Sequence, residues 1–354
     1  MSEIFLTESL PGRTVTLADG REFLWFSGTD YLGMGYNEKF QAHLAEGFRR
    51  YGTHYGSSRN GSLQLAIYEE AEASLAAFVG APAALVVSSG MWSGQLLMSE
   101  LEVIGMVHSA PRVHPALWEQ GYVSQGDSWE EWLQQTIQKI QQSDKQQTHV
   151  ICTDAIGSPW LEEYNLDLLH ELPDTHQTLV LVDDSHGLGV LSREGQGTFS
   201  RLPQTKNVRS VVTASLNKAL GVPGGVLFGD KDFIQSIRQS PKFAGSSPAA
   251  PGYFYAFRQN LINGVLQEAH AKLMANIHYF TKKLSHPDLL NYIENYPVFC
   301  SRDSGLYPYL LEKKILTSHF SYPKPTDPPI VRLVITAQHK KEDLDQLAEV
   351  LSKF

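Results

Sequence analysis

The sequence predicts an α/β protein with a large, doubly wound, mostly parallel sheet domain and a smaller α+β C-terminal domain. Between about residues 38 and 230, short β-branched runs alternate with stretches of helical periodicity, which is typical of βα units. Helical patterns then dominate, and a second group of strand-like runs with a closing helix follows them. We therefore expect an N-terminal hairpin segment over 1–37 that packs with the small domain, a large domain over 38–250 and a small domain over 251–354.

Within the large domain, six apolar and β-branched runs are the strand candidates: 83–89, 105–109, 149–155, 178–185, 208–216 and 224–230. The segment 129–142 has apolar residues spaced as one face of an amphipathic helix. One long helix is expected over 253–284, with the domain boundary inside it. In the small domain we expect strands over 295–300, 315–321 and 329–336, and a closing helix over 340–354.

Composition excludes several classes of protein. The 354 residues carry a formal net charge of -9, which argues against binding to nucleic acid or to an anionic membrane surface. There is neither a targeting segment at the N-terminus nor a run of about 18 apolar residues, so a cytoplasmic location is expected. Cys152 and Cys300 lie far apart in apolar runs, which predicts buried free thiols rather than a disulfide or a metal site.

The strand candidate 178–185 is mainly apolar up to Asp183 and Asp184, which are followed by Ser185 and His186. Polar side chains at the carboxyl end of a buried parallel strand point into the crevice where open α/β sheets bind ligands. The same acids would also suit a solvated strand end or a helix cap. This motif alone leaves both interpretations open.

A lysine follows the next strand in an equivalent position. The run 208–216 leads into Asn217 and Lys218, and small residues come directly after them. A lysine with space beside its amine suits a Schiff base, although most lysines are simply surface residues. Together with an acid able to keep a pyridinium nitrogen protonated, it provides the basic requirements for pyridoxal 5'-phosphate.

A phosphate cradle is the third requirement. The strand 83–89 turns through Ser88, Ser89, Gly90 and Met91 into a helix, and backbone N–H groups at such a helix start favour a phosphate. A Ser-Gly step before a helix is also an ordinary N-cap. The order of the three features along the chain favours the cofactor interpretation.

With these motifs in place, the chain resembles the α-oxoamine synthase family of pyridoxal-phosphate enzymes nearly from end to end. The resemblance implies fold type I of the aspartate aminotransferase superfamily. The segments that carry it are GTDYLGM at 28–34, YGSSRNGS at 55–62, SSGMWSG at 88–94, VHPALWEQG at 113–121, VDDSHGLGVLSREGQGTF at 182–199, TASLNKALG at 213–221, FAGSSPAAPG at 243–252 and RLVITAQHKKEDLDQL at 332–347.

The resemblance implies roles for individual residues around the cofactor ring. Lys218 would form the Schiff base, and Asp183 would pair with the pyridine nitrogen. His186 and Ser158 would lie near the phenolic oxygen. His114 would stack on the ring, although a histidine there could also be an ordinary helix-start residue.

The resemblance also implies the phosphate contacts. Gly90 and Met91, with Ser89 in the same turn, would offer N–H groups, and Ser215 would offer a hydroxyl. Ser246 and Ser247 match a step that reaches the phosphate from a second subunit, which predicts a homodimer with shared active sites. The same two serines could instead form an ordinary turn.

Members of this family condense an amino acid with an acyl-CoA, and that reaction is the first expectation for this chain. A second possibility is another pyridoxal-phosphate reaction on the same fold, such as transamination. A third is a degenerate homologue retained as a binding partner, which the survival of Lys218, Asp183 and His186 argues against.

Three departures from the family pattern bear on the substrates. The Arg-Leu-Arg strand reads Arg332, Leu333 and Val334, so the arginine expected to clamp the substrate carboxylate is missing at 334. The chain begins almost directly at the first hairpin, without the N-terminal helix that in this family helps to form the acyl-CoA entrance. The third departure has two parts, since Thr29 replaces an asparagine in the turn 29–33 and Gly94 replaces another at a helix start. These changes predict an altered amino or acyl substrate.

Overall fold

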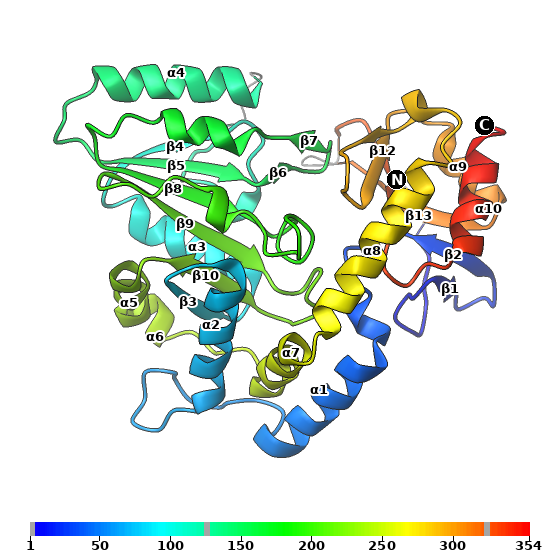
Figure 1. Ribbon diagram of the computed structural model, residues 1–354, viewed down its shortest axis with the longest axis horizontal. Helices are drawn as coiled ribbons and strands as arrows, with labels where there is room; N and C mark the ends of the chain where they lie inside the picture. The colour runs from blue at the N-terminus through cyan, green and yellow to red at the C-terminus, as the bar shows by residue number, and fades with distance from the viewer. Residues whose placement is uncertain (1–3, 124–127, 322–325) are drawn as a thin grey trace. The chain divides into compact units, whose positions relative to one another are not determined.

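The computed structural model describes residues 4–123, 128–321 and 326–354, and the chain forms two compact units (Figure 1). Unit 1 comprises Met1–Glu38, Ser158–Glu162 and Gly264–Phe354, and unit 2 comprises Lys39–Gly157 and Glu163–Asn263. None of the helices in the described part of the chain is both long and apolar enough to cross a bilayer.

Unit 2 is built on a six-stranded sheet of order β3-β10-β9-β8-β5-β4. The pairs β4/β5, β5/β8 and β8/β9 are parallel, and β10 runs antiparallel to both of its neighbours. The strands are β3 (Ala83–Val87), β4 (Met106–Ser109), β5 (His149–Asp154), β8 (Thr178–Asp183), β9 (Val208–Ser215) and β10 (Gly225–Gly229). All six strand predictions for the large domain are confirmed.

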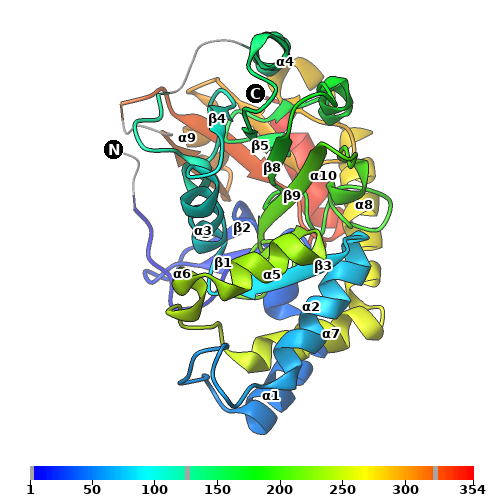
Figure 2. The same cartoon turned by 90° about the vertical axis from the view of Figure 1, so that its left-hand side faces the viewer.

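Helices surround this sheet; Figure 2 shows α5 beside β3, and α5 also contacts β10. Those of unit 2 are α1 (Glu38–Tyr51), α2 (Ala66–Val79), α3 (Gly90–Leu101), α4 (Trp129–Gln142), α5 (Lys231–Gln239), α6 (Pro241–Ala244), α7 (Pro251–Ile262), η2 (Pro115–Leu117), η3 (Leu166–Glu171) and η4 (Phe199–Arg201). Two short strands, β6 (Ile156–Gly157) and β7 (Glu162–Glu163), fall between β5 and η3 in the sequence. Because helices cover the sheet, every residue of β5, β8 and β10 is buried, which explains why these strands are largely apolar.

The predicted helix over 129–142 is confirmed as α4. A capping box starts it, in which the Ser128 hydroxyl accepts from the Glu131 N–H and the Glu131 carboxylate accepts from the Ser128 N–H. Its predicted apolar face, including Trp129 and Leu133, is buried.

Unit 1 contains a six-stranded sheet of order β1-β2-β13-β14-β12-β11. The N-terminal hairpin joins it through a parallel pairing of β2 with β13. Its strands are β1 (Thr14–Thr16), β2 (Glu22–Phe26), β11 (Asn291–Tyr292), β12 (Val298–Ser301), β13 (Ile315–Phe320) and β14 (Ile330–Val334). Its helices are η1 (Met34–Tyr36), α8 (Val265–Thr281), η5 (Pro287–Leu289), α9 (Leu306–Glu312) and α10 (Lys341–Leu351).

The prediction of a single long helix over 253–284 is wrong. The chain forms two helices, α7 and α8, separated at Gly264, whose φ of 72° is left-handed and therefore cannot continue a helix. The unit boundary falls at this break, which lies inside the segment 253–284 and not at residue 250. Helix α7 stays with unit 2 because it packs on α2, where the Tyr68 and Phe254 rings lie 5.5 Å apart.

Three histidines gather at the amino-terminal end of the unit 2 sheet. His108 Nε2 lies 3.1 Å from His149 Nδ1, and His149 Nε2 lies 2.8 Å from the Ser143 hydroxyl. The His176 ring packs edge-on against His149. Burial, followed by the neighbouring His149, lowers the pKa of His108 to about 4. Burial and His176 also lower the pKa of His149.

Because of this cluster, we expect the folded protein to lose stability in mild acid. Between about pH 4 and 6.5 the unfolded chain binds a proton at His108 and the folded chain does not, so the free energy of unfolding should rise with pH across this window. His108→Gln should reduce that slope in urea denaturation measured from pH 4 to 7. The exposed His170 gives the control, and an equal change of slope in His170→Gln would contradict the assignment.

Candidate active site

The carboxyl ends of β5, β8 and β9 lie side by side in the unit 2 sheet. Asp154 pairs in register with Asp183, and Asp183 pairs with Thr213 on the other side. Lys218 follows the end of β9 and is half-buried. The structure thus brings the predicted acid and the segment that carries the predicted lysine to one edge of the sheet.

Asp183 is held by the turn that follows it. Its Oδ1 accepts a hydrogen bond of 2.9 Å from the Ser185 N–H, and the Ser185 hydroxyl accepts one of 2.8 Å from the Ser215 N–H. This polar connection ties the end of β8 to the end of β9. His186 follows in the same turn and is half-buried.

The two neighbouring acids have different roles. The Asp184 carboxylate accepts from the Thr198 N–H at 2.7 Å, and Gly187 and Gly197 approach it so closely that any added Cβ would collide with it. Burial raises the pKa of Asp184 to about 7. Adjacent residues on a strand point to opposite faces, which leaves Asp183 for the site while Asp184 organises the loop 187–198.

His114 begins the short helix η2 and faces Asp183. Its Nδ1 accepts a hydrogen bond of 3.2 Å from the Ala116 N–H and lies 3.9 Å from Asp183 Oδ2. Burial lowers the pKa of His114; Asp183 opposes this effect and Lys218 adds to it. Because Nδ1 accepts a backbone N–H, the ring is neutral with its proton on Nε2, and the short distance to Asp183 is not an ion pair.

The start of α3 also contributes to the site. Ser89 is the N-cap and its hydroxyl accepts from the Trp92 N–H at 3.1 Å. The Gly90 and Met91 N–H groups at the helix start have no acceptor in the described part of the chain. A Cβ at Gly90 would lie 2.5 Å from the Ser215 Cβ, so this helix start is pressed against the end of β9.

These features fit pyridoxal 5'-phosphate. Two open N–H groups and the positive end of a helix suit the phosphate, with the Ser215 hydroxyl beside them. The Asp183 carboxylate is buried and suits a pyridinium nitrogen, while Lys218 supplies the amine. Ser89 and His114 also cap their helices, so the structural interpretation of each residue holds alongside the functional one.

The structure does not gather the remaining predicted residues in the same way. Ser158 belongs to unit 1. Ser246 and Ser247 lie in the loop between α6 and α7, and the Ser246 hydroxyl donates to the Lys242 carbonyl at 2.5 Å. Their predicted contact with a partner's phosphate stays a prediction.

Asp154 was missed at the level of the sequence. Its Oδ2 accepts the His114 backbone N–H at 3.0 Å, and the carboxyl group is buried beside Asp183. The signal that could have found it is the one that singled out Asp183, an acid that ends a largely apolar strand.

Two of the departures from the family pattern have structural explanations. A side chain at Gly94 would collide with the Ala116 carbonyl at 2.6 Å, because α3 packs directly on η2. Val334 is completely buried in the unit 1 sheet, in register with Val298, and therefore serves the core. The strand does carry a guanidinium at Arg332, which is buried and donates to the Tyr31 hydroxyl at 2.9 Å.

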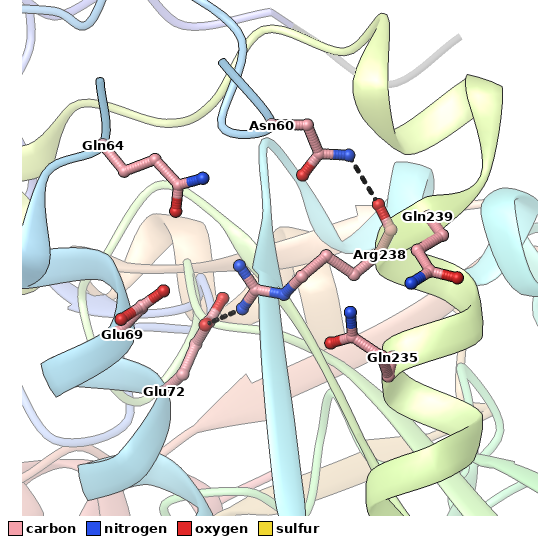
Figure 3. A pocket seen from close by; sticks show the side chains of 7 residues that line it. All are labelled: Asn60, Gln64, Glu69, Glu72, Gln235, Arg238 and Gln239. Carbon is pink, nitrogen blue, oxygen red and sulfur yellow. Dashed lines mark hydrogen bonds and ion pairs between the residues drawn. The ribbon is translucent and has the colours of Figure 1, made fainter. Parts of the chain in front are cut away.

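A hollow of about 520 Å³ in unit 2 is lined by other residues (Figure 3). Its lining is entirely polar: Asn60, Gln64, Glu69, Glu72, Gln235, Arg238 and Gln239. Glu72 already pairs with Arg238 at 2.5 Å and, from its other oxygen, with Arg59. None of the predicted cofactor residues lines this hollow, and its ion pair stabilises the fold.

The fold and the site at the strand ends are those of a pyridoxal-phosphate enzyme, and comparison with known proteins gives the same class. Residues 118–351 match the aminotransferase class I and II family, and the chain belongs to that family. The predictions of a fold type I architecture and of a pyridoxal-phosphate enzyme are thereby confirmed for the family.

Two relatives and one solved structure show which proteins of this class the chain is similar to. The chain is 28% identical to the 8-amino-7-oxononanoate synthase of Petrotoga mobilis, over 98% of this chain and 91% of the relative. It is 27% identical to 8-amino-7-oxononanoate synthase 1 of Bacillus subtilis, again over 98% and 91%. The structure is similar to serine palmitoyltransferase of Sphingomonas wittichii, an α-oxoamine synthase, with a TM-score of 0.82 and 16% identity over 99% of this chain and 91% of that one.

Proposed function

We propose that the protein is an α-oxoamine synthase that uses pyridoxal 5'-phosphate to join an amino acid to an acyl group delivered as an acyl-CoA. The observation that carries the proposal is the cluster of Asp183, His114 and the start of α3 around the segment that bears Lys218. The relatives named 8-amino-7-oxononanoate synthase cover nearly the whole chain and support the same reaction class.

When bound, the cofactor withdraws electrons from the α-carbon of an attached amino acid. The protein's part is to hold and complement it. Asp183 keeps a negative charge beside the pyridine nitrogen, the neutral His114 ring covers the site, and the Gly90 and Met91 N–H groups bind phosphate oxygens. His186 and Ser158 would donate to the phenolic oxygen, and Lys218 Nζ would carry the proton at the α-carbon.

Two assays separate this reaction from transamination on the same fold. The purified protein, supplied with pyridoxal phosphate, is given a panel of amino acids together with acyl-CoAs, and free CoA thiol is measured. In parallel, keto acids are supplied and amino transfer is measured. Release of CoA that requires one amino acid supports the proposal, whereas transfer that requires only a keto acid would replace it with an aminotransferase.

Arg332 is our candidate for binding the carboxylate of the amino-acid substrate. Its guanidinium is buried, yet it donates to the neutral Tyr31 hydroxyl, and no acidic side chain of the described residues pairs with it. A buried cation without a counter-charge is costly, so an anionic ligand would complete it.

We expect Arg332→Gln to raise the KM for the amino acid by about 10- to 100-fold, the effect of losing a charged hydrogen bond, with a smaller change in kcat. Steady-state kinetics with the amino acid varied at saturating acyl-CoA tests this. The exposed Arg302 in the same unit provides the control, and equal effects of Arg302→Gln would contradict a specific role.

The assembly is proposed to be a cytoplasmic homodimer, with Ser246 and Ser247 of each subunit reaching the phosphate bound by the other. Sedimentation measures the dimer. Mixing an inactive Lys218→Ala chain with an inactive double variant of Ser246 and Ser247 tests the sharing, since recovery of activity in the mixture requires mixed dimers.

A further inference from the structure

A buried acid that the proposed mechanism leaves unused accepts a hydrogen bond from the His114 backbone. Asp154 ends β5, is 6% exposed, and its Oδ2 accepts the His114 backbone N–H at 3.0 Å. The His114 ring is fixed at a second point, where Nδ1 accepts the Ala116 N–H. The position of this ring therefore depends on two backbone hydrogen bonds, one of which Asp154 provides.

Asp154 also has a carboxylate as its neighbour. It pairs in register with Asp183 on the adjacent strand, and neighbouring strands are separated by about 4.8 Å. Two ionised carboxylates at such a spacing repel each other strongly in a buried setting, so one of them keeps its proton. The remaining charged groups that act on Asp154 and His114 are the Lys218 amine and Asp183 itself.

The carboxyl that keeps the proton can be identified from the surroundings. Asp183 receives the Ser185 N–H and faces the cofactor site, where a cationic pyridine ring would stabilise its negative charge. Asp154 is enclosed in the strand layer, and burial followed by the charge of Asp183 raises its pKa well above the ordinary value. A neutral carboxyl still accepts a hydrogen bond from a backbone N–H.

We propose that Asp154 is a positioning residue of the cofactor site, whose uncharged carboxyl holds His114 over the ring and leaves the site's negative charge on Asp183. The inference rests on the proposed cofactor function. Asp154 lies outside the set of residues that the family resemblance implies.

Two substitutions distinguish the role of the Asp154 carboxyl as a hydrogen-bond acceptor from any role of its charge. Asp154→Asn retains an oxygen acceptor of the same shape and cannot ionise, whereas Asp154→Ala leaves the His114 N–H without an acceptor. We expect Asp154→Asn to bind pyridoxal phosphate within about 3-fold of the unmodified protein. Asp154→Ala should bind it about 10- to 100-fold more weakly, the range for a buried donor left unpaired, with a reduced visible circular dichroism of the bound cofactor.

The pH profile tests the protonation state without relying on the alanine variant. The dissociation constant of pyridoxal phosphate is measured from pH 6 to 9, and the profile of Asp154→Asn should superimpose on that of the unmodified protein. A profile that differs in shape would show that Asp154 ionises in this range and would overturn the assignment. This arm remains informative even if Asp154→Ala does not fold.

A double-mutant cycle tests whether Asp154 acts through His114. Removing the His114 ring by His114→Ala should abolish most of the effect of Asp154→Ala on the dichroism of the cofactor, because coupled residues are not additive. Additive losses would mean that Asp154 supports the fold in general. If the unmodified protein itself fails to bind pyridoxal phosphate, the proposed function fails, whereas normal binding by Asp154→Ala refutes only this inference.

Discussion

Replacing Lys218 by alanine should remove the visible absorption of covalently attached pyridoxal phosphate and lower kcat by at least about 10²- to 10⁴-fold. That range is the usual effect of losing a proton-transferring side chain. Both effects would have one cause, since in the proposed function the same amine attaches the cofactor and carries the proton. Absorbance titration with pyridoxal phosphate and the CoA-release assay measure them.

The fold should tolerate this change, because the Lys218 side chain is half-buried and follows the strand instead of lying within it. Lys206 is an exposed lysine of the same unit, and Lys206→Ala should leave spectrum and rate unchanged. An unaltered absorption band in the Lys218 variant would refute the assignment of the cofactor lysine.

The second large effect concerns stability. Glu72 lies on α2 and its carboxylate is 6% exposed, as is the Arg59 side chain with which it pairs. One oxygen accepts from Arg59 and from the Val86 N–H at 2.9 Å, and the other accepts from Arg238. Glu72→Leu should lower the free energy of unfolding by about 3–5 kcal/mol, because it leaves two guanidinium groups in the fold without their counter-charge.

Glu69 provides a matched control for this prediction. It lies one turn earlier on the same helix and lines the same hollow, but it is exposed (Figure 3). Glu69→Leu should change the free energy of unfolding by no more than about 0.5 kcal/mol. Comparable urea midpoints for the two variants would show that the buried ion pair contributes little.

Much of the large unit could be predicted from the sequence because the relevant signals are local. A strand covered on both faces is apolar at most positions, so β5, β8 and β10 are visible as largely apolar runs. Where such a run stops at a polar residue, the chain has reached the carboxyl end of the strand. That rule located Asp183 at the end of one strand and, one strand later, the segment that leads to Lys218.

The same rule applied to Asp154, but its role could not be predicted from the sequence, since that role depends on a hydrogen bond to a residue 40 positions away. The break between α7 and α8 was also missed. Helical periodicity continues on both sides of Gly264, and only the left-handed backbone there separates the two helices.

The sequence by itself determined the fold class, the order of the strands along the chain and the residue types from which a pyridoxal-phosphate site is made. The tertiary structure decided which acid faces the site, why position 94 must be glycine, and that Val334 belongs to the core while Arg332 carries the buried charge. The physical reason is that composition and periodicity report whether a side chain is buried. Partners from distant segments then decide what a buried polar group does.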